Sequence, residues 1–300
     1  MRIGLNGGGP SLGRTIADAQ RAESEGFAAY SMAGDSTSTL ALIGSQTESI
    51  ELQTAVVPIF GIHPAVIAGQ ARVAHEASNG RFTLGIGLSH AVMIEGRMGY
   101  SFERPAARMR EYLQILMPLL RGEGVAVNGE FYSYTGEPGG TTDAGAVPCG
   151  IAALAPVMLR LAGELAAGTV LWMANAQAIE GYIKPRVDRA AANVGAADPQ
   201  IIASLPIALT DDVPAAREEA SRQFAMYGTL PSYRAILDHG GAANPGDAAL
   251  LGSEEELDAE LDRLEAAGVT LFNGAVFRAE QGGPARTREY LADRARSRNG

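Results

Sequence analysis

The residue types that carry covalent or metal chemistry are scarce in this chain. It contains one cysteine, Cys149, four histidines and one lysine, Lys184. One cysteine permits neither an intramolecular disulfide nor a cysteine-based zinc cluster, and we interpret Cys149, which follows Pro148, as a small buried residue. The sequence therefore predicts no metal site, and polar side chains at the ends of apolar segments become the main candidates for chemistry.

Two polar residues are candidates for acid–base catalysis. His90 ends the run GIGLSH, where a strand end would project it into a pocket as a contact for a cofactor or substrate; a rim histidine with only a structural hydrogen bond is the alternative. Asp35 lies in the run YSMAGDSTST. It could act as an acid or base, or it could cap the following helix together with Ser36 and Thr37. Both pairs of interpretations stay open at the level of sequence.

A possible anion site lies within the run IAALAPVMLRLAG, in which an apolar segment leads into a helix opened by Pro156. The first turn of a helix offers unpaired N–H groups and the positive end of a dipole, which suit a phosphate group. Because Pro156 has no N–H, we expect the donors to be Leu154, Ala155 and Val157.

The glycines of GIGLSH also have two interpretations. They could let the backbone approach a flat ligand, or they could form turns at a rim.

These residues are positioned by alternating strands and helices. Short apolar or β-branched runs recur along the chain, and most are followed by a segment of helical periodicity, which is typical of parallel βα units. Eight strands, most of them leading to a helix, favour a closed (β/α)8 TIM barrel over an open doubly wound sheet, and we expect residues 1–300 to form a single domain. The predicted strands are residues 2–5, 28–32, 50–57, 82–87, 148–153, 169–173, 201–209 and 269–276.

Two segments interrupt this alternation. Residues 122–147 contain Asn128-Gly129 between short apolar runs, which predicts a hairpin, and then a segment rich in glycine, threonine and proline at 136–145 that we expect to be a mobile loop. Residues 227–249 lie between the seventh and eighth strands. We expect both insertions to reach the C-terminal rim of the barrel, where active sites of this fold lie.

Composition and charge narrow the possible functions. Hydrophobic residues make up 46% and charged residues 19% of the chain, and the formal net charge is −10, so we expect a folded protein with no nucleic-acid surface. No apolar stretch is long enough to span a bilayer and the N-terminal run does not fit a signal peptide, which predicts a cytoplasmic protein without a membrane partner. Alanines on the helices at 16–25 and 64–77 predict close packing between subunits in a homodimer.

Several motifs together resemble one enzyme superfamily. The run from Ile50 to His90 contains TAVVP, HPAVIAGQ and NGRFTLGIG, and a later block reads PCGIAALAPVMLRLAGELAAGTVLWMANAQ. With ERPAARMREYLQIL, TDDV and FAMYGTLPSYR, the order and spacing of these motifs are similar to the luciferase-like monooxygenase superfamily, in its branch that uses the deazaflavin coenzyme F420. The resemblance covers nearly the whole chain. It implies the same barrel, a homodimer and a flavin-type cofactor.

The resemblance also implies positions for the site. In this superfamily the third strand carries a bulge, often with a non-proline cis peptide, that supports the central ring of the cofactor; here that bond would be Ala55–Val56, although an ordinary core strand is the alternative. Trp172 and Met173 could border the cofactor or be plain core residues. The residues that the resemblance assigns to the cofactor are Asn6, Ala55, Val56, Gly87, Ser89, His90, Ala153, Leu154, Ala155, Trp172 and Met173, and those assigned to the substrate are Tyr227 and Tyr233.

The chain departs from the family pattern in two places. Many relatives carry an acid–histidine pair after the second strand, whereas this chain has Asp35 nearest to that position, so the usual proton donor is missing; Leu154 and Ala155 stand where many relatives have glycine. The resemblance still implies a reductase that transfers hydride from reduced F420 to a C=C or C=N bond of a small organic molecule. An FMN-dependent monooxygenase and a non-catalytic binding barrel are the two alternatives.

Overall fold

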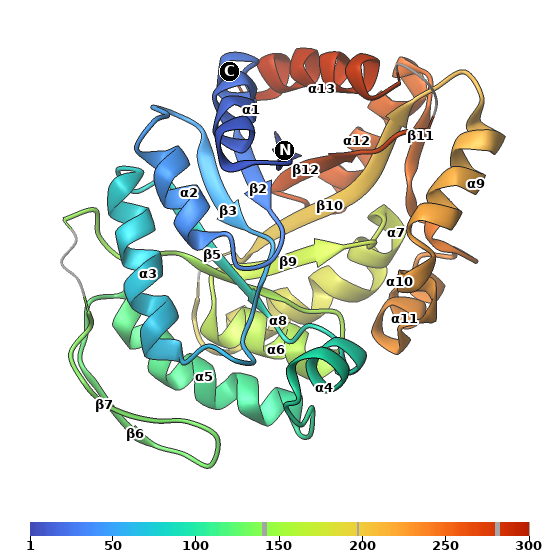
Figure 1. Cartoon of the computed structure of the whole chain (residues 1–300). Helices are drawn as coiled ribbons and strands as arrows, with labels where there is room; N and C mark the ends of the chain where they lie inside the picture. The colour runs from blue at the N-terminus through green and yellow to red at the C-terminus, as the bar shows by residue number, and fades with distance from the viewer. Residues whose placement is uncertain (140–142, 197, 280–282, 300) are drawn as a thin grey trace.

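Eight parallel strands form a closed barrel in the computed structural model, which describes residues 1–139, 143–196, 198–279 and 283–299 (Figure 1). Each strand pairs with its neighbours in the order β12-β1-β2-β3-β5-β8-β9-β10, and β10 pairs again with β12 to close the ring. The predicted (β/α)8 barrel is therefore confirmed. The eight strands are β1 (Arg2–Asn6), β2 (Ala29–Met32), β3 (Glu51–Thr54), β5 (Phe82–Gly87), β8 (Cys149–Ala152), β9 (Gly168–Trp172), β10 (Gln200–Leu209) and β12 (Leu271–Val276).

Helices cover the outside of the barrel, as Figure 1 shows, and the helices expected at residues 16–25, at 64–77 and from Pro156 are all present. The helical segments are α1 (Leu12–Ser24), α2 (Thr37–Gly44), α3 (Pro64–Ala77), α4 (Ala91–Met98), α5 (Pro105–Leu120), α6 (Pro156–Leu165), α7 (Ala176–Ala178), a π-helix (Ile179–Ile183), α8 (Lys184–Asn193), α9 (Val213–Gln223), α10 (Ala225–Thr229), α11 (Pro231–His239), a 3-10 helix (Pro245–Ala248), α12 (Glu254–Ala266) and α13 (Gly283–Asn299). The short helix α4 was not expected from the sequence, and the insertion at 227–249 contains helix α11 and the 3-10 helix.

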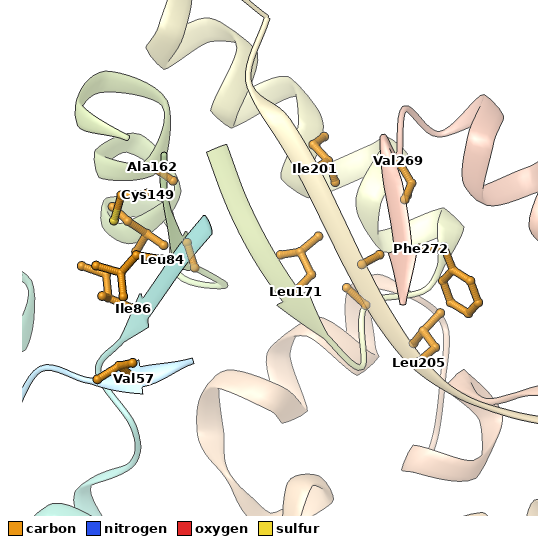
Figure 2. Packing of buried hydrophobic residues seen from close by; sticks show 14 of the residues in the cluster. Val57, Leu84, Ile86, Cys149, Ala162, Leu171, Ile201, Leu205, Val269 and Phe272 are labelled. Atoms are coloured by element: carbon orange, nitrogen blue, oxygen red, sulfur yellow. The ribbon is translucent and has the colours of Figure 1, made fainter. Parts of the chain in front are cut away.

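The strands are buried on both faces, which accounts for their nearly continuous apolar sequences. One side of each strand packs against helices; Figure 2 shows Leu84 and Ile86 of β5 near Cys149 of β8 and Ala162 of α6. A second, smaller apolar cluster joins four different strands through Ala29, Val170, Ile202 and Leu271, with Ala55 and Val56 packed against it. We place this cluster inside the barrel, where small and branched side chains close the interior.

Burial raises the pKa of the Cys149 thiol to about 12, consistent with an inert core residue.

The third strand is interrupted at the place where the resemblance implied a bulge. The ladder between β3 and β5 ends at Gln53 opposite Thr83, and it resumes in β4 (Val57–Pro58) with Val57 opposite Ile86. Three residues on one strand therefore oppose two on the other, which defines a β-bulge. The Thr54 hydroxyl bridges the gap, because it donates to the carbonyl oxygen of Gly85 at 2.9 Å and accepts from the Gly85 N–H at 2.8 Å. The Ala55–Val56 peptide bond is cis, as expected.

The predicted hairpin is confirmed in β6 (Val125–Asn128) and β7 (Ser133–Gly136), which pair antiparallel. Its tip is held by the Glu111 carboxylate of α5, which accepts hydrogen bonds from the N–H groups of Glu130, Phe131 and Tyr132. The Tyr132 hydroxyl donates to the carbonyl oxygen of Ile59 at 3.4 Å, so the tip reaches the loop after β4 at the rim. The loop expected at 136–145 falls partly on residues 140–142, outside the described residues.

The homodimer was predicted from six alanines of α1 and α3, of which Ala17 is exposed, Ala65 is half-buried and the other four are buried. Ala19 and Ala22 of α1, and Ala68 and Ala71 of α3, are buried within this chain, because they face the barrel where small side chains let helix and sheet approach closely. The reasoning behind the expected homodimer was therefore wrong for these four residues.

Among the described residues, no helix combines the length and the apolar character needed to cross a membrane.

Candidate functional site

A cavity of about 460 Å³ opens at the carboxyl ends of the strands. Its lining comes from seven of the eight barrel strands or the loops that follow them, and from helices α6, α10 and α11. Of the residues that the structure describes, no aspartate, glutamate, lysine or arginine lines it. The lining residues are Asn6, Ala33, Gly34, Ala55, Val56, Pro58, Leu88, Ser89, His90, Ala152, Ala153, Leu154, Ala155, Met158, Val170, Leu171, Trp172, Ser204, Tyr227, Ser232 and Tyr233.

Most of the residues predicted for the site meet at this cavity. Those that line it are Asn6, Ala55, Val56, Ser89, His90, Ala153, Leu154, Ala155, Trp172, Tyr227 and Tyr233. Three predicted residues do not line it. Gly87 lies behind the wall, Met173 is buried, and Asp35 is exposed to solvent. Asp35 does not cap helix α2. The capping residue of that helix is Ser36, and the Ser36 side chain makes no capping hydrogen bond.

The back wall of the cavity depends on two glycines of β5. An ideal Cβ on Gly85 would lie 2.1 Å from the carbonyl oxygen of Thr54, and one on Gly87 would lie 2.7 Å from Cγ2 of Val56. Neither distance is possible for real atoms, so only glycine lets the bulge at Ala55 and Val56 seat against β5. The glycines of GIGLSH therefore serve close packing of the cavity wall, and the bulge presents Val56 toward a ligand.

Strained backbone marks the ends of two strands on either side of β8. Ser89, after β5, has φ of 59°, and Met173, after β9, has φ of 61°. Left-handed backbone costs a residue other than glycine roughly 1–2 kcal/mol, and such residues often lie at functional sites. Both turns redirect the chain at the cavity rim, which explains why Trp172 lines the cavity while the next residue, Met173, points into the core.

The amino terminus of α6 faces the cavity through Leu154 and Ala155. Ala155 is the capping residue and cannot accept a hydrogen bond with its side chain. Within the described parts of the chain, the backbone N–H groups of Leu154, Ala155 and Val157 make no hydrogen bond. Three N–H groups and the helix dipole are thus available to an anion, as the sequence indicated.

An aromatic wall closes another side of the cavity. His90 lies against Tyr233 of α11, with ring centroids 5.5 Å apart; Tyr233 contacts Tyr227 of α10 at 4.8 Å, and Tyr227 contacts Trp172 at 5.8 Å. Burial lowers the pKa of His90 and raises the pKa values of Tyr227 and Tyr233. At neutral pH the histidine is therefore uncharged and both phenols keep their protons.

Polar atoms without partners lie at the floor of the cavity. The side-chain oxygens of Asn6 and Ser204 are buried and make no hydrogen bond within the described residues. Below them, Asn273 of β12 donates to Gln53 of β3 across the barrel at 3.1 Å. Sequence reasoning missed Ser204 because it lies in the apolar run of β10; a lone serine at an inward position of a buried strand was the only available signal.

Comparisons with known proteins match the whole barrel. A family model described as luciferase-like monooxygenase matches residues 2–298. The 5,10-methylenetetrahydromethanopterin reductase of Archaeoglobus fulgidus is 34% identical over 158 residues, which are 53% of this chain and 47% of that protein. The F420-dependent glucose-6-phosphate dehydrogenase of Nocardia farcinica is 33% identical over 165 residues, covering 52% of this chain and 48% of that protein. The matches thus span about half the length of these relatives.

A solved structure extends the comparison to the complete fold. An F420-dependent secondary alcohol dehydrogenase in complex with an F420-acetone adduct superimposes with a TM-score of 0.80 and covers 97% of both chains. Its sequence identity to this chain is 15%, so the likeness concerns the fold alone.

Proposed function

Because the chain belongs to the luciferase-like monooxygenase family, we propose that it is an oxidoreductase that uses coenzyme F420. In this proposal it is a reductase that adds hydride to a C=C or C=N bond of a small, uncharged organic molecule. The observation that carries the proposal is the cavity itself, which is backed by the bulge at Val56 and has no charged side chain among the described residues of its lining. The F420-dependent relative from Nocardia farcinica supports the choice of cofactor.

The residues present fit a deazaflavin on three counts. The seat of Val56 against Gly87 gives a flat, apolar support of the kind that a ring system requires. The amino terminus of α6 offers N–H donors at Leu154 and Ala155 for an anionic side chain. The unpartnered oxygens of Asn6 and Ser204 can accept hydrogen bonds from ring N–H groups at the cavity floor. When bound, the reduced cofactor supplies a hydride from its C5 position.

The protein's own contribution is orientation and exclusion of water. Val56 would hold the cofactor ring, and His90, Tyr227 and Tyr233, which line the same cavity, would contact a substrate beside it. A substrate between ring and wall is held in one orientation, which lowers the entropic part of the barrier. Apolar residues such as Leu88 and Met158 complete the lining and keep water from the reacting atoms.

The lining also indicates the kind of substrate. A sugar phosphate, such as the one named in the relative from Nocardia farcinica, carries a dianion, whereas no cationic side chain of the described residues lines this cavity. The N–H groups at the start of α6 would already hold the cofactor's own anionic tail. Transfer of an unpaired anion into such a site is costly. We therefore expect uncharged, conjugated molecules to be preferred over glucose 6-phosphate.

Cofactor binding tests the proposal directly. The purified protein is titrated separately with F420 and with FMN, and the quenching of cofactor fluorescence is measured. We expect binding of F420, and a large loss of affinity in Val56→Asp, which would place a carboxylate against the ring. Binding of FMN alone would favour the monooxygenase, and binding of neither would favour a cofactor-free binding barrel.

A further inference from the structure

The cavity needs a proton source that the usual family residues do not supply. Addition of hydride to a conjugated carbonyl compound pushes an electron pair onto the carbonyl oxygen, and that charge requires a nearby donor. Asp35 is exposed and absent from the lining. The titratable groups that do line the cavity are His90, Tyr227 and Tyr233, and all three belong to the aromatic wall.

Contacts within the wall distinguish these three groups. The Tyr227 ring lies between Tyr233 and Trp172, and the indole N–H of Trp172 approaches the Tyr227 hydroxyl without meeting hydrogen-bond geometry. Tyr233 lies between His90 and Tyr227, and its hydroxyl makes no hydrogen bond to any described residue. Tyr233 thus has a free phenol beside a histidine that is uncharged at neutral pH.

We propose that Tyr233 is the proton donor of the reaction, acting on the oxygen of a conjugated carbonyl substrate. This inference rests on the proposed function. Hydride adds to the β-carbon, the C=C electron pair moves to form an enolate, and the enolate oxygen takes the phenolic proton. The products are the enol and a tyrosinate, and the enol then becomes the saturated ketone. The tyrosinate then takes a proton from solvent, which restores the phenol.

Burial agrees with this role. Removal from water raises the pKa of Tyr233, so the phenol stays protonated at all physiological pH values and is available as a donor. The neutral imidazole of His90 is a weaker acid than a phenol, so Tyr233 is the better donor of the two. Among the described residues, no carboxyl group or cationic side chain lines the cavity to offer another proton.

The donor can be tested without knowing the substrate. The probe is 4-nitrophenolate, whose conjugated oxyanion imitates an enolate, and its binding is followed by its visible absorbance. The control ligand is 4-nitroanisole, which has the same ring but no oxyanion. Wild-type protein is compared with Tyr233→Phe and with the matched control Tyr227→Phe, each with and without saturating F420.

We expect Tyr233→Phe to weaken 4-nitrophenolate binding by about tenfold to a hundredfold, the effect of losing a hydrogen bond to a charged group. Binding of 4-nitroanisole should change less than about twofold, because the Phe ring preserves the wall, and Tyr227→Phe should have a small effect on both ligands. Equal effects of the two variants, no effect of Tyr233→Phe, or no binding of 4-nitrophenolate by the wild type would overturn the inference. Failure of F420 to bind would instead overturn the proposed function, whereas the ligand series tests Tyr233 independently.

Discussion

The side chain of Val56 occupies the space that a side chain on Gly87 would need, since an ideal Cβ on Gly87 would lie 2.7 Å from Cγ2 of Val56 and 3.1 Å from Cβ of Ala152. Two residues 31 positions apart thus fix the back wall of the cavity. The wall is the surface on which the proposed cofactor ring rests, so its position sets the depth of the site.

Gly87→Ala is expected to push Val56 toward the cavity. Overpacking of this kind costs about 1–3 kcal/mol, and the displaced wall should also weaken F420 binding. Thermal unfolding and fluorescence titration measure the two effects. The matched control is Gly69→Ala in α3, where an added Cβ would meet no atom within 4 Å. That change should stabilise the protein by about 0.5–1 kcal/mol without changing cofactor affinity, and a Gly87→Ala protein that behaved the same way would contradict the role of the wall.

Ala155→Glu is expected to weaken binding of the cofactor's anionic tail. The substitution places a negative charge beside the free N–H groups at the start of α6, and like-charge repulsion should cost roughly 1–3 kcal/mol of binding free energy. Ala155→Gln keeps the size and removes the charge, so it should bind F420 nearly as well as the parent. The far-ultraviolet circular dichroism of both variants should be unchanged. Unaltered F420 affinity in Ala155→Glu would show that the tail lies elsewhere.

Several buried tyrosines should make the fold sensitive to alkaline pH. Burial and a hydrogen bond to Asp18 raise the pKa of Tyr30, and burial raises that of Tyr112. The folded pKa values exceed the unfolded value of about 10, so this stability is complete below pH 10 and is lost as the pH rises toward the folded values. Each such tyrosine should remove at most about 1.4 kcal/mol per pH unit in that range.

Chemical denaturation at pH 9 and pH 11 measures this loss. Tyr30→Phe should lower stability at pH 9, because the buried ring loses its hydrogen bond to Asp18, and it should reduce the difference between the two pH values. A difference as large as that of the parent would indicate that Tyr30 does not titrate in this way.

We still predict a homodimer, but we expect exposed apolar residues of α2 and α3 to form its interface instead of the buried alanines. Val66 and Val73 of α3 are 53% and 55% exposed, and Leu42 of the adjacent helix α2 is 46% exposed. Val66 and Val73 are seven residues apart and share one helix face. Sedimentation of the parent should give twice the chain mass of 31.2 kDa, and Val66→Glu with Val73→Glu should give the monomer. A parent that sediments only at the chain mass would refute the dimer.

The sequence alone determined the barrel and one wall of its site. Alternating apolar runs and helical segments indicate βα units because each local pattern reports how its own residues are buried. The bulge at Ala55–Val56 was expected from the resemblance to the superfamily, which contiguous motifs such as TAVVP carry, whereas the role of the glycines of GIGLSH stayed open between two interpretations. Their close contact follows from the pairing of β3 and β4 with β5, which neighbour each other in space.

Only the tertiary structure decided which polar groups face the cavity and which are paired. Ser204 lies in an apolar run, and its hydroxyl is left without a partner only because the closed barrel turns it inward. Tyr233 meets His90 because α11 folds back over the end of β5, 143 residues earlier in the chain. Asp35, three residues past the end of β2, is exposed, although Ala33 and Gly34 just before it line the cavity. Which polar side chains face the cavity, and which find a hydrogen-bond partner, depends on how the strands and helices are placed relative to one another. That placement is a property of the assembled fold and not of any local segment.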